Sequence, residues 1–366
     1  MHHPRLAPTR QPYGGAVPSP AVDLAPVVGS DHVRWRIPAA WAPGGVRLEV
    51  DWVLTADPEF RRSGRHWVYR LERPAANRFD YRLVLRGGGT EGPVLDPTNP
   101  RRLAHPFGDR SEIRFPEYVE PAWLVGTPAG PTEALNLSRG DLERPVPTRV
   151  WSPAGLDPRT PAPMLVVHDG TSLAEDGSLL SWAARRTPGR PLRVALLDAP
   201  EGTRDRWYAA NPCYARHLVT VVLPALRDRW PVSTVVGLGA SLGALAMLGA
   251  QRAHPGAFDA LALQSGTFLA PDLDPQESGL GTFGQICRAV EDYASQEPMR
   301  TVPVLMSCGA IEENLANNQR MAKALAGQGY PVRWVVNPDG HTVIGWRDVW
   351  APHLDTLVAE VAGSGA

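Results

Sequence analysis

The residues with the clearest chemical signature form the run 239–243, Gly-Ala-Ser-Leu-Gly. A serine between two such glycines is a nucleophile when it stands on a sharp turn between a strand and a helix. The β-branched run 234–236 leads into the motif, and the helix-forming stretch 244–251 follows it. A helix that begins behind the serine directs its free N–H groups toward an oxyanion formed there. The pattern predicts that Ser241 is a nucleophile of acyl-transfer chemistry.

A dinucleotide-binding loop is the competing interpretation, because Gly237 and Gly239 also lie between a strand and a helix. That fingerprint requires a third glycine where this chain has Leu242, and an acidic residue after a second strand, about 20 positions on. Asp259 lies near that distance but precedes the next apolar run instead of ending it. The run favours a nucleophile over a cofactor loop, and a plain packing turn is the remaining alternative.

Two of the apolar runs after Ser241 end in the residues that such a serine needs. A serine hydroxyl requires a histidine base, and the histidine requires a carboxylate that holds its tautomer. The run 302–307 leads to Glu312 and Glu313, and the run 332–336 leads to His341. Serine, acid and histidine in this order, each after a strand, are typical of α/β-hydrolases. We therefore expect His341 to be the base.

Three carboxylates compete for the third role. We favour Glu312 over Glu313, because only one of two adjacent residues faces the site, and acidic residues are also common before a helix such as the one expected over 314–327. Asp339 is more simply a turn residue of Pro-Asp-Gly.

His168 is the main competitor for the base because it ends an apolar run, but it precedes the serine. The other histidines are expected on surfaces, on helix faces or in another domain: His2, His3, His32, His66, His105, His217, His254 and His353.

An oxyanion formed at Ser241 needs two backbone N–H donors. Leu242, the residue after the nucleophile, supplies one by its position. The second is expected from the loop after the apolar run 163–167, at Thr171 or its neighbour, although an ordinary Asp-Gly turn explains the same residues equally well.

Five side chains near these strand ends are candidate substrate contacts. Asp169 lies in the turn just described, and Arg204, Tyr208 and Asn211 lie in a loop expected after the strand that ends at residue 198. Trp346 lies in the helix expected after the histidine. Helix capping or packing explains the three loop residues equally well, and a core position is the commoner role for a tryptophan at that place.

Several further motifs lie along residues 145–360. They are His168-Asp169-Gly170, Asp198 followed by Arg204, Asn211, Leu223-Pro224, the serine run, Gln264-Ser265-Gly266, Gly309-x-x-Glu312 with Asn318, and His341 followed by Trp346-Arg347. Taken together, these motifs resemble the enterochelin esterase family of esterase-D-type α/β-hydrolases. The resemblance implies a serine hydrolase of esters, often of the lactone of a catecholate siderophore, with Ser241, Glu312 and His341 as its triad. It also implies an immunoglobulin-like N-terminal domain.

One feature departs from that family. A siderophore esterase meets a large anionic or iron-loaded ligand, so a basic pocket is expected. Arg204, Arg206 and Arg347 are candidates for it, but all basic side chains here except Lys323 are arginines. Their presence therefore says little about the substrate.

The chain of 366 residues suits two domains. Residues 1–25, rich in Pro, Gly and Ala, are expected to be disordered, and 26–118 show the alternating short strands of a β-sandwich. A linker is expected over 119–144 and the α/β-hydrolase domain over 145–366. The stretch after Asp96 reads as irregular. The N-terminal domain is interpreted as a wall of the substrate pocket or as a packing module without ligand contact.

Composition narrows the function classes further. The net charge of −1 gives no support for nucleic-acid or anionic-membrane binding. No apolar stretch approaches the roughly 20 residues that cross a membrane, and residues 1–20 lack the apolar core of a signal peptide. The three cysteines, Cys213, Cys287 and Cys308, have no metal or disulfide spacing, which indicates a reducing, cytoplasmic setting.

The sequence thus predicts an α/β-hydrolase fold with a smaller N-terminal β-sandwich domain. It predicts a serine esterase that acts on a small-molecule ester without metal or cofactor. An acyltransferase or thioesterase with the same three residues, and a binding protein that keeps the fold without turnover, are the alternatives. The sequence does not determine the oligomeric state.

Overall fold

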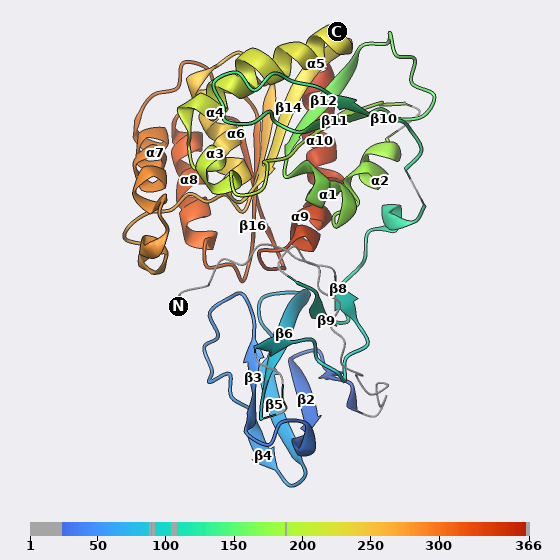
Figure 1. The fold of residues 1–366 in the computed structure, drawn as a ribbon, viewed down its shortest axis with the longest axis vertical. Helices are drawn as coiled ribbons and strands as arrows, with labels where there is room; N and C mark the ends of the chain where they lie inside the picture. The colour runs from blue at the N-terminus through green and yellow to red at the C-terminus, as the bar shows by residue number, and fades with distance from the viewer. Residues whose placement is uncertain are drawn as a thin grey trace.

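The computed structural model describes residues 24–87, 89, 92–103, 108–126, 128–186 and 189–363. These residues form a small all-β body and a larger body in which helices cover a central sheet (Figure 1). All but the last two residues of the segment 1–25, expected to be disordered, lie outside the described residues, as do His2, His3 and His105.

The small body is a sandwich of antiparallel sheets. Its strands are β1 (Val27–Val28), β2 (His32–Pro38), β3 (Gly45–Glu49), β4 (Arg61–Ser63), β5 (His66–Glu72), β6 (Arg78–Arg86), β7 (Pro93–Val94), β8 (Arg102–Leu103) and β9 (Arg110–Arg114). The two sheets have the orders β1-β2-β5-β4 and β3-β6-β9-β8, and β7 pairs with β6. Val33, Trp35 and Ile37 alternate along β2 and are buried, and Trp35 meets Tyr81 edge-on with ring centroids 5.4 Å apart. The alternating sequence pattern therefore fills the space between the sheets.

The larger body is built on one mixed sheet. Its strands are β10 (Thr132–Leu135), β11 (Thr148–Trp151), β12 (Ala162–His168), β13 (Arg193–Leu197), β14 (Val232–Ala240), β15 (Ala260–Gln264), β16 (Val304–Gly309) and β17 (Val332–Asn337). The order is β10-β11-β13-β12-β14-β15-β16-β17; β10 and β11 are antiparallel to their neighbours and the others run parallel. The carboxyl ends of the parallel strands share one edge, where ligands bind in open α/β sheets.

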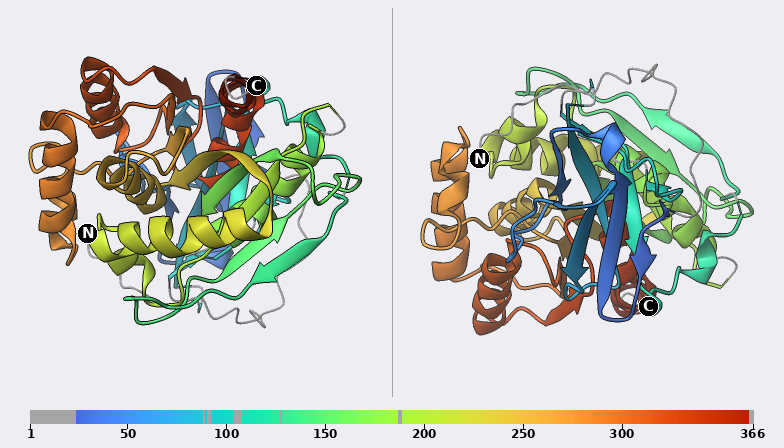
Figure 2. Two further views of the ribbon diagram at one scale, coloured as in Figure 1. Left: turned by 90° about the horizontal axis from the view of Figure 1, so that it is seen from above. Right: turned by 90° about the horizontal axis from the view of Figure 1, so that it is seen from below.

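Helices pack on both faces of this sheet (Figure 2). One face carries α3 (Arg204–Tyr208), α4 (Pro212–His217), α5 (Leu223–Arg229), α6 (Leu242–Ala253), α7 (Phe283–Ser295) and α8 (Leu315–Gly327). The other carries α1 (Gly170–Glu175), α2 (Leu179–Ala184), α9 (Val343–Val349) and α10 (Asp355–Gly363). Short helical turns lie at Ala39–Trp41, Ala122–Leu124, Leu218–Val222, Pro275–Gly279 and Trp350–Leu354.

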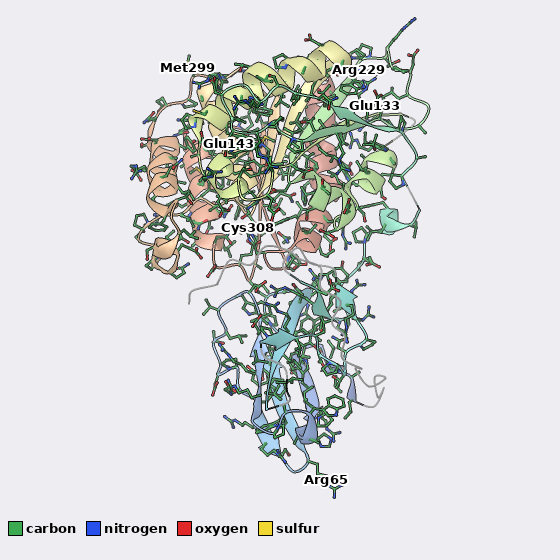
Figure 3. All side chains as sticks on the ribbon, viewed as in Figure 1. Arg65, Glu133, Glu143, Arg229, Met299 and Cys308 are labelled. Atoms are coloured by element: carbon green, nitrogen blue, oxygen red, sulfur yellow. The ribbon has the colours of Figure 1, made fainter. Side chains whose placement is uncertain are left out.

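The sandwich lies at the end of the larger body to which the parallel strands point (Figure 1). Figure 3 labels Cys308, in β16, near the junction of the two bodies, and Arg65 at the far tip of the sandwich. The N-terminal domain therefore stands beside the edge of the sheet where the candidate residues lie.

Three segments differ from the sequence prediction. β10 lies within the expected linker 119–144 and pairs with β11, and Arg229 donates to Glu133 of this strand at 2.7 Å (Figure 3). β8 and β9 lie in the stretch expected to be irregular, and α3 lies in the expected loop 204–211. These elements are short, and β10 is a sheet edge with alternate residues exposed, so none has a long apolar run that would reveal it.

The observed architecture is the α/β-hydrolase fold preceded by a small β-sandwich, as the sequence predicts. Alternating strands and helices on a largely parallel sheet account for the larger body. Among the residues that the structure describes, no helix is both long enough and apolar enough to cross a membrane.

Candidate active site

Ser241 occupies the sharp turn between β14 and α6. Its backbone angles, φ 55° and ψ −126°, lie in a region that non-glycine residues rarely adopt. A side chain at Gly239 would overlap the carbonyl of Gly243, and one at Gly243 would come within 3.0 Å of His168 Cβ. The two glycines are thus required by the closeness of the turn. Strain of this kind, held by the surrounding structure, is typical of a nucleophile turn.

Strained residues gather at this edge of the sheet. Asp169 after β12 and Ser265 after β15 have φ values of 51° and 46°, beside the 55° of Ser241 after β14. Such conformations cost of order 1–3 kcal/mol each and persist where the fold over-determines them, most often at functional sites.

The Ser241 hydroxyl is partly exposed, and its oxygen lies 3.2 Å from Thr267 Oγ1. Within the described residues it makes no hydrogen bond to His341. Leu242 is the first residue of α6, so its N–H has no acceptor within the helix. This N–H points out of the N-terminal end of the helix, beside Ser241. The serine turn therefore presents a hydroxyl and an N–H donor side by side, and the oxyanion role of Leu242 stays a prediction.

His341 follows β17 and is held by Glu312, which follows β16. His341 Nδ1 lies 2.8 Å from Glu312 Oε2, and the side chains are 33% and 0% exposed, respectively. Because a carboxylate only accepts, Nδ1 carries the proton and Nε2 is left as the basic nitrogen. Of the two adjacent acids, the structure brings Glu312 to the histidine, whereas Glu313 is exposed.

The charges of this pair reinforce one another. Burial lowers the pKa of His341, but the charge and hydrogen bond of Glu312 outweigh it and raise the pKa above its ordinary value. Burial raises the pKa of Glu312, and the charge of His341, with hydrogen bonds from His341, Ser265 and Gly309, lowers it below its ordinary value. The carboxylate is therefore ionised, and it favours a charged imidazolium.

A chain of hydrogen bonds fixes Glu312 from behind. Its Oε1 accepts from Ser265 Oγ and from the Gly309 N–H, both at 2.6 Å. Ser265 Oγ accepts in turn from Trp346 Nε1 at 2.8 Å. The Trp346 ring also meets His341 edge-on, with centroids 5.1 Å apart. Trp346 thus packs against the histidine and donates to Ser265. Its contact with the substrate stays a prediction.

His168, the competitor for the base, is fully buried and engaged on both ring nitrogens. Nδ1 lies 3.0 Å from Gly243 O, and Nε2 lies 2.8 Å from the Tyr214 hydroxyl. A carbonyl only accepts, so Nδ1 donates and Nε2 accepts from the tyrosine. Burial lowers the pKa of His168 to about 4, so the ring is neutral at physiological pH. His168 therefore binds the backbone of the serine turn through the Gly243 carbonyl.

Of the predicted substrate contacts, Asp169 and Arg204 pair at the surface of the site. Arg204 Nε and Nη2 donate to the two carboxylate oxygens of Asp169 at 2.8 and 2.7 Å. The prediction for Tyr208 is wrong, because its side chain is fully buried against the His168 ring. Asn211 caps α4, accepting from the N–H groups of residues 213 and 214, so it takes the capping role that the sequence left open.

The prediction that Thr171 supplies the second oxyanion donor is also wrong in this structure. Its N–H donates to Asp198 Oδ1 at 3.0 Å, and its hydroxyl pairs with the other oxygen of the same carboxylate. Arg149 donates to the Thr171 hydroxyl at 2.6 Å. The residue is therefore committed to binding the end of the neighbouring strand.

The sandwich also contributes to the surroundings of the histidine, which the sequence did not predict. A small cavity of about 10 Å³ lies against His341, and Asp51, Trp52, Phe79 and Asp80 of the sandwich line one side of it. Nothing local in 51–80 marks these residues, because their proximity to the histidine depends on how the two bodies pack. Thr267, the partner of the serine hydroxyl, has no motif around it either; it approaches Ser241 because it follows β15, the neighbour of β14 in the sheet.

A strained serine before a helix, with a histidine and a buried carboxylate after later strands of the same sheet, defines the site of an α/β-hydrolase fold. Such a site brings together a hydroxyl, an imidazole and a carboxylate, which are the groups that acyl transfer through a serine uses.

Comparison with solved structures agrees with this fold, although no protein-family model and no curated protein matches the sequence. An enterobactin esterase from Shigella flexneri, solved in the presence of enterobactin, is 18% identical with a TM-score of 0.68, over 93% of this chain and 96% of that one. A ferric enterobactin esterase from Salmonella typhimurium is 16% identical with a TM-score of 0.69, over 93% and 97%. A ferulic acid esterase is 18% identical with a TM-score of 0.52, over 64% and 97%. The resemblance to the enterochelin esterase family is thus confirmed at the level of the fold.

Proposed function

We propose that this protein is a serine esterase in which Ser241 is the nucleophile, His341 the base and Glu312 the acid. The observation that carries the proposal is the His341–Glu312 hydrogen bond at the sheet edge that also holds the strained serine. The pair leaves Nε2 basic and aimed away from the carboxylate, which is the state that a general base needs.

The proposed reaction begins when the serine hydroxyl turns from Thr267 toward His341. Ser241 Oγ bonds to the ester carbonyl carbon as its proton passes to His341 Nε2. The carbonyl oxygen, now an oxyanion, is held by the Leu242 N–H and by a second N–H that we assign to the Asp169–Gly170 turn in place of Thr171. Collapse breaks the bond to the leaving oxygen, which receives the proton from the histidine. Water activated by the same nitrogen then hydrolyses the acyl-enzyme.

Within the esterases we propose a siderophore-type ester or lactone as the substrate. The support is that the likeness to the two enterobactin esterases extends over 93% of this chain, sandwich included. A cytoplasmic setting is proposed from Cys213, Cys287 and Cys308, which are all free thiols in the structure.

Hydrolysis by wild-type protein and Ser241→Ala tests the proposal. The substrates are a catecholate trilactone, a short p-nitrophenyl ester and an acyl thioester, with and without an alcohol acceptor. We expect the wild type to hydrolyse the oxygen esters and the variant to lose at least roughly 10³-fold in kcat/KM. Equal turnover by both proteins would contradict the nucleophile, and transfer to the alcohol in place of hydrolysis would indicate an acyltransferase.

A further inference from the structure

One buried arginine of the sandwich, Arg78 at the start of β6, reaches the loop that carries His341. The side chain is 0% exposed, and its Nε donates to Glu112 Oε1 of the sandwich at 2.9 Å. Its Nη1 donates to Asp339 Oδ1 and Oδ2 at 3.0 and 2.8 Å, and to Thr342 Oγ1 at 3.0 Å. A guanidinium anchored in one body therefore holds two residues of the other.

These two residues bracket the histidine. Asp339 lies two positions before His341 and accepts from the Gly340 N–H at 2.7 Å. Thr342 lies directly after it, and its hydroxyl oxygen accepts from the Gly345 N–H at 2.9 Å, which caps the start of α9. Holding both side chains fixes the chain on each side of the imidazole.

The neighbouring backbone adds to the same contact. The Asn77 N–H, directly before β6, donates to the Pro338 carbonyl at 2.7 Å, so two consecutive residues, Asn77 and Arg78, bind the histidine loop. Ile311, the residue before Glu312, packs against the apolar core of the sandwich. The sandwich thus contacts both loops that carry the base and its acid.

An ordinary ion pair on the same strand provides a contrast. Arg82 pairs with Glu49 inside the sandwich at 2.6 Å, with both side chains partly exposed. Asp339, by comparison, is buried, which raises its pKa to about 6 against the opposing charge of Arg78. Without the guanidinium, burial would raise the pKa of this carboxyl further, which favours the protonated form and weakens the charged acceptor of the loop.

We propose that Arg78 is a positioning residue for His341, which holds Asp339 and Thr342 so that the imidazole faces Ser241 while its Nδ1 stays on Glu312. The inference rests on the proposed esterase function. It makes the N-terminal domain part of the catalytic apparatus, because a group outside the hydrolase body sets the geometry of the base. Misplacement of a reacting group by about 1 Å can cost on the order of 10²-fold in rate.

Arg78→Lys and Asp339→Asn test the proposal, with Arg82→Lys as the matched control. All are assayed for p-nitrophenyl butyrate hydrolysis and for labelling by a fluorophosphonate, with circular dichroism to verify folding. We expect kcat to fall by about 10²-fold in the two test variants, with KM changed less than threefold, and to stay within twofold in the control. The labelled fraction at long times stays at one site per chain, because a misplaced base slows the reaction without removing active sites.

The pH profile separates positioning from mere stability. The charges that face His341 come from Glu312, Glu313, Arg204 and Asp51. Arg78→Lys keeps all of them and also keeps a positive charge at position 78. A midpoint of kcat/KM that moves toward lower pH in Arg78→Lys therefore reports a loosened contact with Glu312.

The outcomes are distinguishable. If both test variants fold and keep kcat within twofold, positioning is overturned while the esterase function stands. If the labelled fraction falls below one site per chain while the rate of hydrolysis is unchanged, the positioning role is also overturned. If Arg78→Lys is unfolded, the positioning role is judged from Asp339→Asn, because asparagine keeps the size and shape of the side chain. Failure of the wild type itself to hydrolyse or to be labelled contradicts the proposed function instead.

Discussion

Replacing Glu312 by glutamine perturbs the candidate site by a single atom. Oε1 accepts two hydrogen bonds, from Ser265 and from the Gly309 N–H. The Ser265 hydroxyl donates to Glu312, while its oxygen accepts from Trp346. To keep both of these bonds, the glutamine oxygen takes the Oε1 position, which leaves its amide NH₂ facing His341 Nδ1.

The magnitude follows from the two ways in which the variant can respond. In the first, His341 shifts its proton to Nε2, the wrong tautomer for a base, and a change of that kind costs about 10⁴-fold in the serine-protease template. In the second, the amide flips, so that its NH₂ faces the Ser265 hydroxyl and the Gly309 N–H. Each of the two hydrogen bonds lost in this way costs about 1–3 kcal/mol. The lower of the two costs applies, so we expect a loss of about 4 kcal/mol in transition-state stabilisation, or roughly 10³-fold in kcat/KM.

The assay is p-nitrophenyl butyrate hydrolysis by wild type and Glu312→Gln, with Glu313→Gln as a matched control. The control changes the adjacent, exposed acid and should stay within threefold of wild type. A Glu312→Gln protein that folds and retains kcat/KM within threefold would refute the assignment of the acid and the reasoning about the tautomer.

Three further results are expected. The rising limb of kcat/KM against pH should have its midpoint above 6.5, because Glu312 raises the pKa of His341 and the base acts only when neutral. A midpoint at or below pH 6.5 in a series of assays across pH contradicts this expectation. Gly239→Ala should yield little folded protein in an expression and circular-dichroism test, since its Cβ overlaps a backbone carbonyl of the serine turn; a fully active variant would show that the turn is looser. Tyr214→Phe removes the donor to the buried His168 Nε2 and should lower the free energy of unfolding by about 1–3 kcal/mol in urea titration while kcat stays within threefold; unchanged stability would mean that the ring nitrogen finds another donor.

The parts of the site that the sequence predicts are those encoded locally or by strand order. The turn at Ser241 needs glycine at fixed offsets, so its pattern is visible within five residues. His341 and Glu312 follow consecutive strands, and parallel strands bring their carboxyl ends to one edge. Order along the chain was therefore enough to place them together, and the structure joins them at 2.8 Å.

The parts that the sequence did not predict depend on packing between distant segments. Arg78 and Asp339 are 261 positions apart, and neither has a local signal, since one arginine resembles many others and Pro-Asp-Gly suggests a turn alone. Thr171 failed for a related reason: the strand order puts β13 beside β12, so Asp198 reaches its N–H first. Tyr208 lies on a short helix whose buried face could not be deduced from five residues.

The most direct test of the account is the site and rate of fluorophosphonate labelling, read by mass spectrometry of the modified peptide. We predict one label per chain on Ser241, none in Ser241→Ala, and labelling at least roughly 10³-fold slower in His341→Ala, because an unassisted serine hydroxyl is a poor nucleophile. A label on Ser265 or Thr267 instead, or an unchanged rate without the histidine, would contradict the claim that this edge of the sheet holds an activated serine.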